Sequence, residues 1–101
     1  MDKNTFWHII DSVNSEVSSS DQKGILRVTQ EKLQDYSPQE IAVWANFLRY
    51  YRDVADTSGV FAASCILNDY MSDDGFMDFR AWLISRGKDV YLAALKNPDT
   101  L

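Results

Sequence analysis

The sequence has few of the residues that cross-link or interrupt a fold: one cysteine, 2 prolines and 4 glycines in 101 residues. Cys65 cannot form an internal disulfide, on which small secreted domains usually depend. We therefore expect a reducing compartment, the cytoplasm. The scarcity of glycine and proline, with no sustained strict alternation of apolar and polar residues, argues against a β-sandwich or an α/β sheet.

Long apolar runs are missing as well. The first apolar run, Phe6 to Ile10, contains a histidine and stops at Asp11, so it is too short for a signal peptide. No stretch approaches the roughly 20 apolar residues of a membrane span. We expect neither a targeting segment nor contact with a membrane.

Positive charge is also scarce, with 10 lysines and arginines against 15 aspartates and glutamates and a net charge of −5. Non-specific nucleic-acid binding depends on basic residues, so the composition disfavours it. Residues 49–52 (Arg-Tyr-Tyr-Arg) do interleave basic and aromatic side chains, as some nucleic-acid surfaces do. On a helix, however, these four point in different directions. Net acidity instead suits solubility or a basic partner.

What the chain has in abundance is helical periodicity. Apolar residues make up 46% of it and recur at three- and four-residue steps, with no sustained alternation. The pattern predicts an all-α fold, a compact single-domain bundle of five or six short helices spanning residues 1–101. The expected helices cover about residues 5–17, 21–35, 38–55, 60–71, 73–86 and 89–96.

Capping signals set several of these boundaries. We expect Asn4 or Thr5 to cap the first helix, and Ser37 to cap the third in a capping box with Glu40. Gly87 is expected to end the fifth in a left-handed conformation. The thin apolar stripe of the second helix predicts a peripheral position. The small residues of the fourth (Ala62, Ala63, Ser64) predict a central one.

Patterns for metal or cofactor chemistry are weak, and we expect neither group. Four aspartates surround Gly75 (Asp69, Asp73, Asp74, Asp78), which invites a calcium loop. Aligned on that glycine, an EF-hand would place Tyr70 first and Ala81 last, and neither can serve. Capping by Ser72 or Asp73 explains the segment better. A catalytic pair of His8 with Cys65 requires the fold to bring them together.

The strongest candidates for a structural or partner-binding role lie in the fifth helix: Asp73, Asp74, Arg80, Trp82 and Arg86. An unpaired buried charge is costly, so we expect a carboxylate from Asp69, Asp73 or Asp74 to pair with Arg80. Tryptophan and arginine are also enriched at protein–protein hot spots. The orientation of Trp82 decides between a structural keystone and a contact surface.

Four short motifs stand out along the chain. They are Thr-Phe-Trp-x-x-Ile at 5–10, Leu-x-x-x-Ser-Pro-x-Glu-Ile at 33–41, Ser-Asp-Asp-Gly-Phe at 72–76 with its continuation Phe-Arg-x-Trp-Leu-Ile, and Asn-Pro-Asp at 97–99. In these the chain resembles bacterial domain-of-unknown-function family 4240. The resemblance implies no catalytic residue or ligand. Some members are fused to WGR modules in molybdate-metabolism regulators, which implies an accessory role. Members often extend further, which implies a C-terminally shorter chain here.

Our leading interpretation is a non-enzymatic protein-interaction or regulatory accessory domain with an unidentified protein partner. Three alternatives stay open: an immunity or adaptor protein that masks a basic partner, an enzyme with a spatially assembled site, and a nucleic-acid-associated accessory. The sequence does not distinguish the partner or the oligomeric state.

Overall fold

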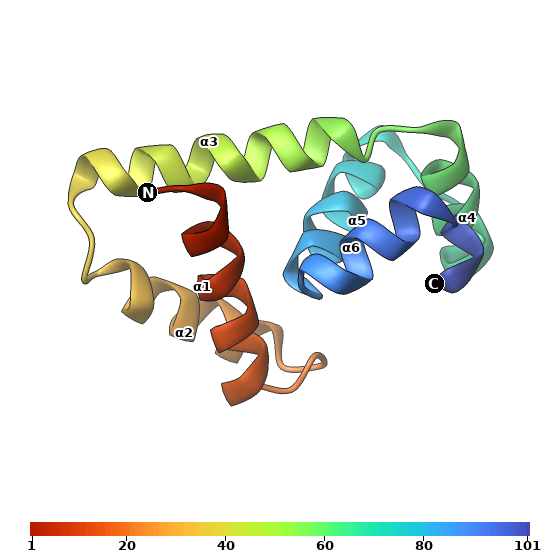
Figure 1. The fold of residues 1–101 in the computed structure, drawn as a ribbon. Helices are drawn as coiled ribbons and strands as arrows, with labels where there is room; N and C mark the ends of the chain where they lie inside the picture. The colour runs from red at the N-terminus through yellow and green to blue at the C-terminus, as the bar shows by residue number, and fades with distance from the viewer.

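The computed structural model describes residues 1–101 as six α-helices without a strand. In Figure 1 the long α3 runs along one edge, with α1 and α2 beside its first half and α4, α5 and α6 near its second. The all-α prediction of five or six short helices is confirmed. The elements are α1 (Lys3–Glu16), α2 (Gln22–Leu33), α3 (Pro38–Val54), α4 (Ser58–Asn68), α5 (Asp73–Ser85), α6 (Lys88–Lys96) and a 3₁₀ turn, η1 (Pro98–Thr100).

Local signals placed most helix starts correctly. Ser37 Oγ accepts the Glu40 N–H at 3.2 Å, and the Glu40 carboxylate accepts the Ser37 N–H at 3.4 Å, so the capping box is confirmed. The first helix is the exception, because Asp2 rather than Asn4 or Thr5 caps it and accepts the Thr5 N–H at 2.8 Å. That backbone hydrogen bond lowers the pKa of Asp2.

The core joins residues of α5 to an aromatic cluster between α1, α3 and α6. Phe6 is fully buried, and the Trp7 ring lies 4.9 Å from Tyr51 and 5.3 Å from Tyr91, centroid to centroid. The Tyr91 hydroxyl donates to the Tyr51 carbonyl at 2.7 Å. Trp7 lies off the apolar stripe that Phe6, Ile9, Ile10 and Val13 form along α1, yet it is buried as they are. Trp7 is buried because aromatic rings of α3 and α6 cover it.

The junction between α5 and α6 depends on Gly87. The glycine ends α5 as expected, but its φ of 103° and ψ of 165° lie outside the left-handed helical region. Only glycine adopts this conformation readily. A Cβ there would also lie 2.8 Å from Asp11 Oδ1 in α1. The position therefore brings α6 close to α1 as well as turning the chain.

Helix α4 is peripheral, which corrects the prediction that its small residues place it centrally. Only Val60 and Ser64 are buried, and the helix packs mainly against α5 and η1. Small side chains permit a close approach, but no helix takes up the opposite face of α4. Helix α2 is also peripheral and buries only Gly24 and Val28, and for this helix the prediction is confirmed.

Candidate functional site

Arg80 is a buried structural residue of α5. Its Nη1 donates to the Arg52 carbonyl at 2.9 Å, and its guanidinium carbon lies 4.6 Å from the centroid of the Phe76 ring. The expectation of a partner at Asp69, Asp73 or Asp74 was wrong, because Asp56 supplies the carboxylate at 3.7 Å. Arg80 thus holds α5 against the C-terminal end of α3.

Asp73 and Asp74 are exposed in the first turn of α5, where the helix dipole favours negative charge. Ser72 is the cap and accepts the Gly75 N–H at 3.0 Å. Neither aspartate forms an ion pair within 4.0 Å. No group of three or more histidine, cysteine and acidic residues is arranged to hold a metal ion.

Trp82 faces outward and is 38% exposed. Its ring lies 5.5 Å from that of Phe79 on one side, and the Arg86 guanidinium carbon lies 5.9 Å from its centroid. Partial burial lowers the pKa of Arg86. Trp82 is therefore partly covered by Phe79 and Arg86, and the rest of its side chain is exposed to solvent.

Trp82 opens onto one of two hollows beside α4. We call the first, of about 510 Å³, the inner hollow; its apolar lining is Leu67, Met71, Phe79 and Trp82, with Gln22, Asn68, Gly75 and Asp78 around them. The outer hollow, of about 420 Å³, is lined by Gly59, Ala62, Ala63, Ile66, Leu67, Asn97, Pro98, Asp99 and Leu101. Leu67 belongs to both, so it stands between them. We call the two hollows together with Tyr70 the α4–α5 surface.

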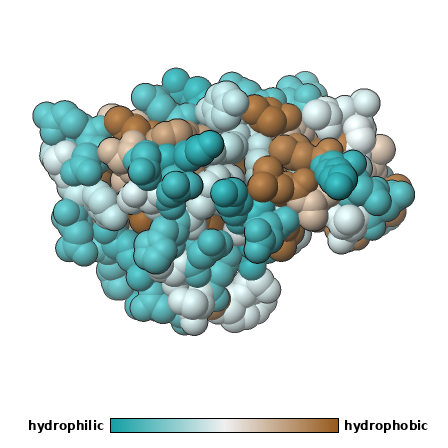
Figure 2. All heavy atoms as spheres, viewed as in Figure 1, coloured by the Kyte–Doolittle hydropathy of each residue, from teal (hydrophilic) through white to brown (hydrophobic).

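Large apolar side chains are unusually exposed on this surface. The exposed fractions are 80% for Ile66, 79% for Tyr70 and 52% for Leu67. In Figure 2 an apolar area interrupts the polar surface on the side where α4, α5 and α6 lie in Figure 1. Single exposed apolar residues are normal, but a contiguous group of them around a concave part of the surface marks an interaction site.

A strained turn presents Tyr70. Asp69 has a φ of 63° and a ψ of −49°, and the Tyr70 N–H donates to the Asn68 carbonyl at 2.7 Å. This is a γ-turn, which is rare and strained for a residue other than glycine. The chain reverses there between α4 and α5, and the Tyr70 side chain is left in solvent.

The segment that supplies most of the α4–α5 surface contains only acidic charges. From Asp53 to Phe79 the sequence has six aspartates and no lysine or arginine. Only Asp56 among them forms an ion pair, with Arg80. Sequence reasoning singled out Trp82, which lines the inner hollow, but missed Ile66, Leu67 and Tyr70, since α4 was expected inside the bundle. The absence of lysine and arginine between Asp53 and Phe79 was the signal in the sequence that could have indicated this surface.

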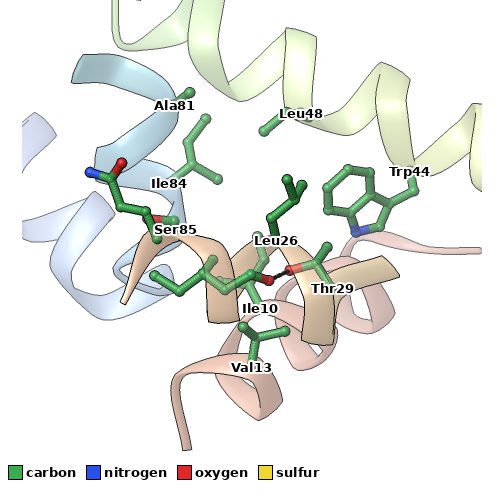
Figure 3. Close-up of a pocket in the computed structure, with 11 residues that line it drawn as sticks. Ile10, Val13, Leu26, Thr29, Trp44, Leu48, Ala81, Ile84 and Ser85 are labelled. Atoms are coloured by element: carbon green, nitrogen blue, oxygen red, sulfur yellow. Dashed lines mark hydrogen bonds between the residues drawn. The ribbon is translucent and has the colours of Figure 1, made fainter. Parts of the chain in front are cut away.

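A separate apolar cavity of about 310 Å³ lies where α1, α2, α3 and α5 meet (Figure 3). Trp44 and Leu48 of α3 border it opposite Leu26 of α2, and no charged residue lines it. The Thr29 hydroxyl at its edge already donates to the Ile25 carbonyl at 2.7 Å. The cavity is therefore almost wholly apolar.

The remaining candidates are dispersed. His8 is exposed on α1 and Cys65 is half-buried on α4; neither lines the hollows or the cavity described above. Arg49 is exposed, whereas Arg52 is half-buried and its Nε is buried without a partner. The fold does not bring these side chains into one site.

Comparisons with known proteins give a family but no activity. No curated protein and no solved structure matches the chain. None of its helices has the length and apolar character needed to cross a membrane. A protein-family comparison matches residues 1–101, the whole chain, to the family described as protein of unknown function (DUF4240). The chain therefore belongs to this family.

Proposed function

We propose that the chain is a non-enzymatic, cytoplasmic protein-binding module whose contact surface is the α4–α5 surface. The observation that carries the proposal is the exposure of Ile66, Leu67 and Tyr70 next to two hollows. Leaving such side chains in water forgoes about 1.5–3 kcal/mol of burial free energy for each large apolar residue. A partner that covers them recovers part of that free energy.

The hollow beside Trp82 supports the proposal. Protein interfaces favour aromatic residues, methionine and arginine, and the inner hollow contains Trp82, Phe79 and Met71 with Arg86 stacked behind Trp82. Trp82 is already ordered by Phe79, so binding costs little side-chain entropy. The surface is therefore pre-arranged for contact.

Site-specific photo-crosslinking in cells that encode this protein tests the proposal. A photoreactive phenylalanine analogue replaces Tyr70 in one strain and Tyr50 of α3 in another, because both tyrosines are exposed, at 79% and 60%. We expect a discrete protein adduct from position 70 and none from position 50. Leu67→Ser should abolish that adduct.

Two results would overturn the proposal. One is the absence of any adduct from position 70, and the other is the same adducts from both positions. Mass spectrometry of a discrete adduct identifies the partner, so the test yields the unknown protein and the contact point together.

A further inference from the structure

We infer that the α4–α5 surface binds a basic amphipathic helix of the partner protein. This inference rests on the proposed function and adds the chemical class of the binding element. Three features of the surface select that element: its shape, its charge and the all-helical frame around it.

The shape suits the side chains of one helix. Leu67 stands between the inner and outer hollows, so apolar side chains on either side of it can each enter one hollow. Residues at i, i+3, i+4 and i+7 of a helix project from one face in this manner. The outer hollow is bordered by Ala62 and Ala63, whose small side chains allow a helix backbone to approach α4.

The charge selects a basic helix. Asp78 lines the inner hollow and Asp99 the outer one, and Asp69, Asp73 and Asp74 lie in or next to the turn that precedes α5. None of these five aspartates is in an ion pair. Lysine and arginine flanking an apolar stripe would meet carboxylates that have no other partner. Charges at such a rim mainly increase the association rate and the specificity.

Other occupants fit less well. A second copy would bring the same aspartates against this rim, and like charges placed opposite each other disfavour association. Anionic membranes and nucleic acid carry the wrong charge for the same reason. A peptide that binds by strand addition would need an exposed sheet edge to pair with, and this fold has no strand.

Three synthetic helical peptides of about 18 residues test the inference. They share one leucine stripe and differ only in the flanking residues: lysine, glutamine or glutamate. Titration into the ¹⁵N-labelled protein gives affinities and contact residues by NMR. We expect the lysine peptide to bind about tenfold or more tightly than the glutamine peptide, and the glutamate peptide to bind weakest. The perturbed amides should include Leu67, Tyr70 and Trp82.

Salt gives an independent measure. Raising the ionic strength from about 10 mM to about 1 M shortens the Debye length from about 30 Å to about 3 Å. The affinity of the lysine peptide for the protein should fall several-fold over this range and approach that of the glutamine peptide.

Matched variants separate the apolar and the charged contribution. Asp78→Lys should reduce the affinity for the lysine peptide about tenfold. Asp35→Lys reverses another exposed charge, in the α2–α3 turn, and should leave that affinity nearly unchanged. Leu67→Ser should reduce the affinity for all three peptides. Leu92→Ser, at a leucine with a similar exposure of 47% on α6, should not.

Equal affinities, a preference for glutamate or glutamine, or no binding overturns the basic-helix inference. Binding to anionic lipid vesicles, or a dimer in sedimentation that Leu67→Ser dissociates, overturns it in favour of another occupant. A protein adduct from position 70 together with any of these results leaves the proposed function standing. Absence of that adduct overturns both the proposed function and the basic-helix inference.

Discussion

Arg80 has two kinds of partner, which differ in exposure. The Arg52 carbonyl and the Phe76 ring lie in the interior, whereas the Asp56 side chain is 63% exposed. An exposed carboxylate is screened by water, so an ion pair to it contributes little. At the scale of single residues, the carbonyl bond and the packing over Phe76 are the contacts that matter most.

We therefore predict that substitutions of Arg80 and of Asp56 lower the free energy of unfolding by different amounts. Arg80→Ala should lower the free energy of unfolding by about 2–3 kcal/mol, because it leaves a carbonyl without its donor and removes packing. Asp56→Asn should cost less than about 1 kcal/mol. Denaturant unfolding of both variants measures the difference, and equal losses would show that the ion pair dominates.

Tyr91 makes stability sensitive to alkaline pH. Burial, with smaller effects from Tyr51 and Tyr50, raises the pKa of Tyr91 above its ordinary value of 10.0. A raised pKa in the folded state means that the stabilisation is complete below pH 10 and is lost as the pH rises above it.

Tyr91→Phe should consequently be less stable than the natural protein near neutral pH, by about 1 kcal/mol for the lost hydrogen bond to Tyr51. The two proteins should converge as the pH rises above 10, because only the natural one has this phenol to ionise. Unfolding free energies measured from pH 7 to 11 check this. A difference that stays constant with pH would contradict it.

At the scale of elements, most helix starts were predictable, whereas the surroundings of Trp7 and of α4 were not. Ser37 and Ser72 act on amides three residues away, so the sequence contains both partners of each cap. The burial of Trp7 depends on Tyr51 and Tyr91, which are distant in the sequence. The exposure of α4 likewise depends on the absence of a neighbour, which no local pattern records.

Gly87 gives a prediction at this scale. Gly87→Ala and Gly87→Asn should each lower the free energy of unfolding by about 1–3 kcal/mol. Asparagine commonly replaces glycine in the left-handed helical region, but the ψ of 165° lies outside that region. Thermal unfolding compares the two variants, and recovery of stability by asparagine alone would show that the residue is left-handed helical after all.

At the scale of the whole molecule, some helices pack closely together and others leave a cavity between them. Aromatic rings fill the space between α1, α3 and α6, whereas the cavity of Figure 3 separates α2 and α3. The sequence predicted the fold class and the peripheral α2. It did not predict the cavity or the exposed α4 side of the α4–α5 surface, because both arise where elements fail to meet.

Filling the cavity should stabilise the protein. Ala81 lines it from α5, and Ala81→Leu adds apolar volume to a space of about 310 Å³. Substitutions that fill cavities commonly add about 0.5–2 kcal/mol. The melting temperature measures the gain, and Ala45→Leu at an exposed position of α3 is the control. A loss of stability at position 81 would show that the helices close over this space in solution.

Two neighbouring carbonyls near the end of α3, those of Tyr51 and Arg52, accept side-chain hydrogen bonds from α6 and α5 respectively. The first turn of α3 has only its own capping box. The two ends of one helix are thus coupled to the rest of the protein to different degrees. Amide hydrogen exchange should be slow in the last turns and fast in the first, and the last turns should open only when α5 and α6 also detach.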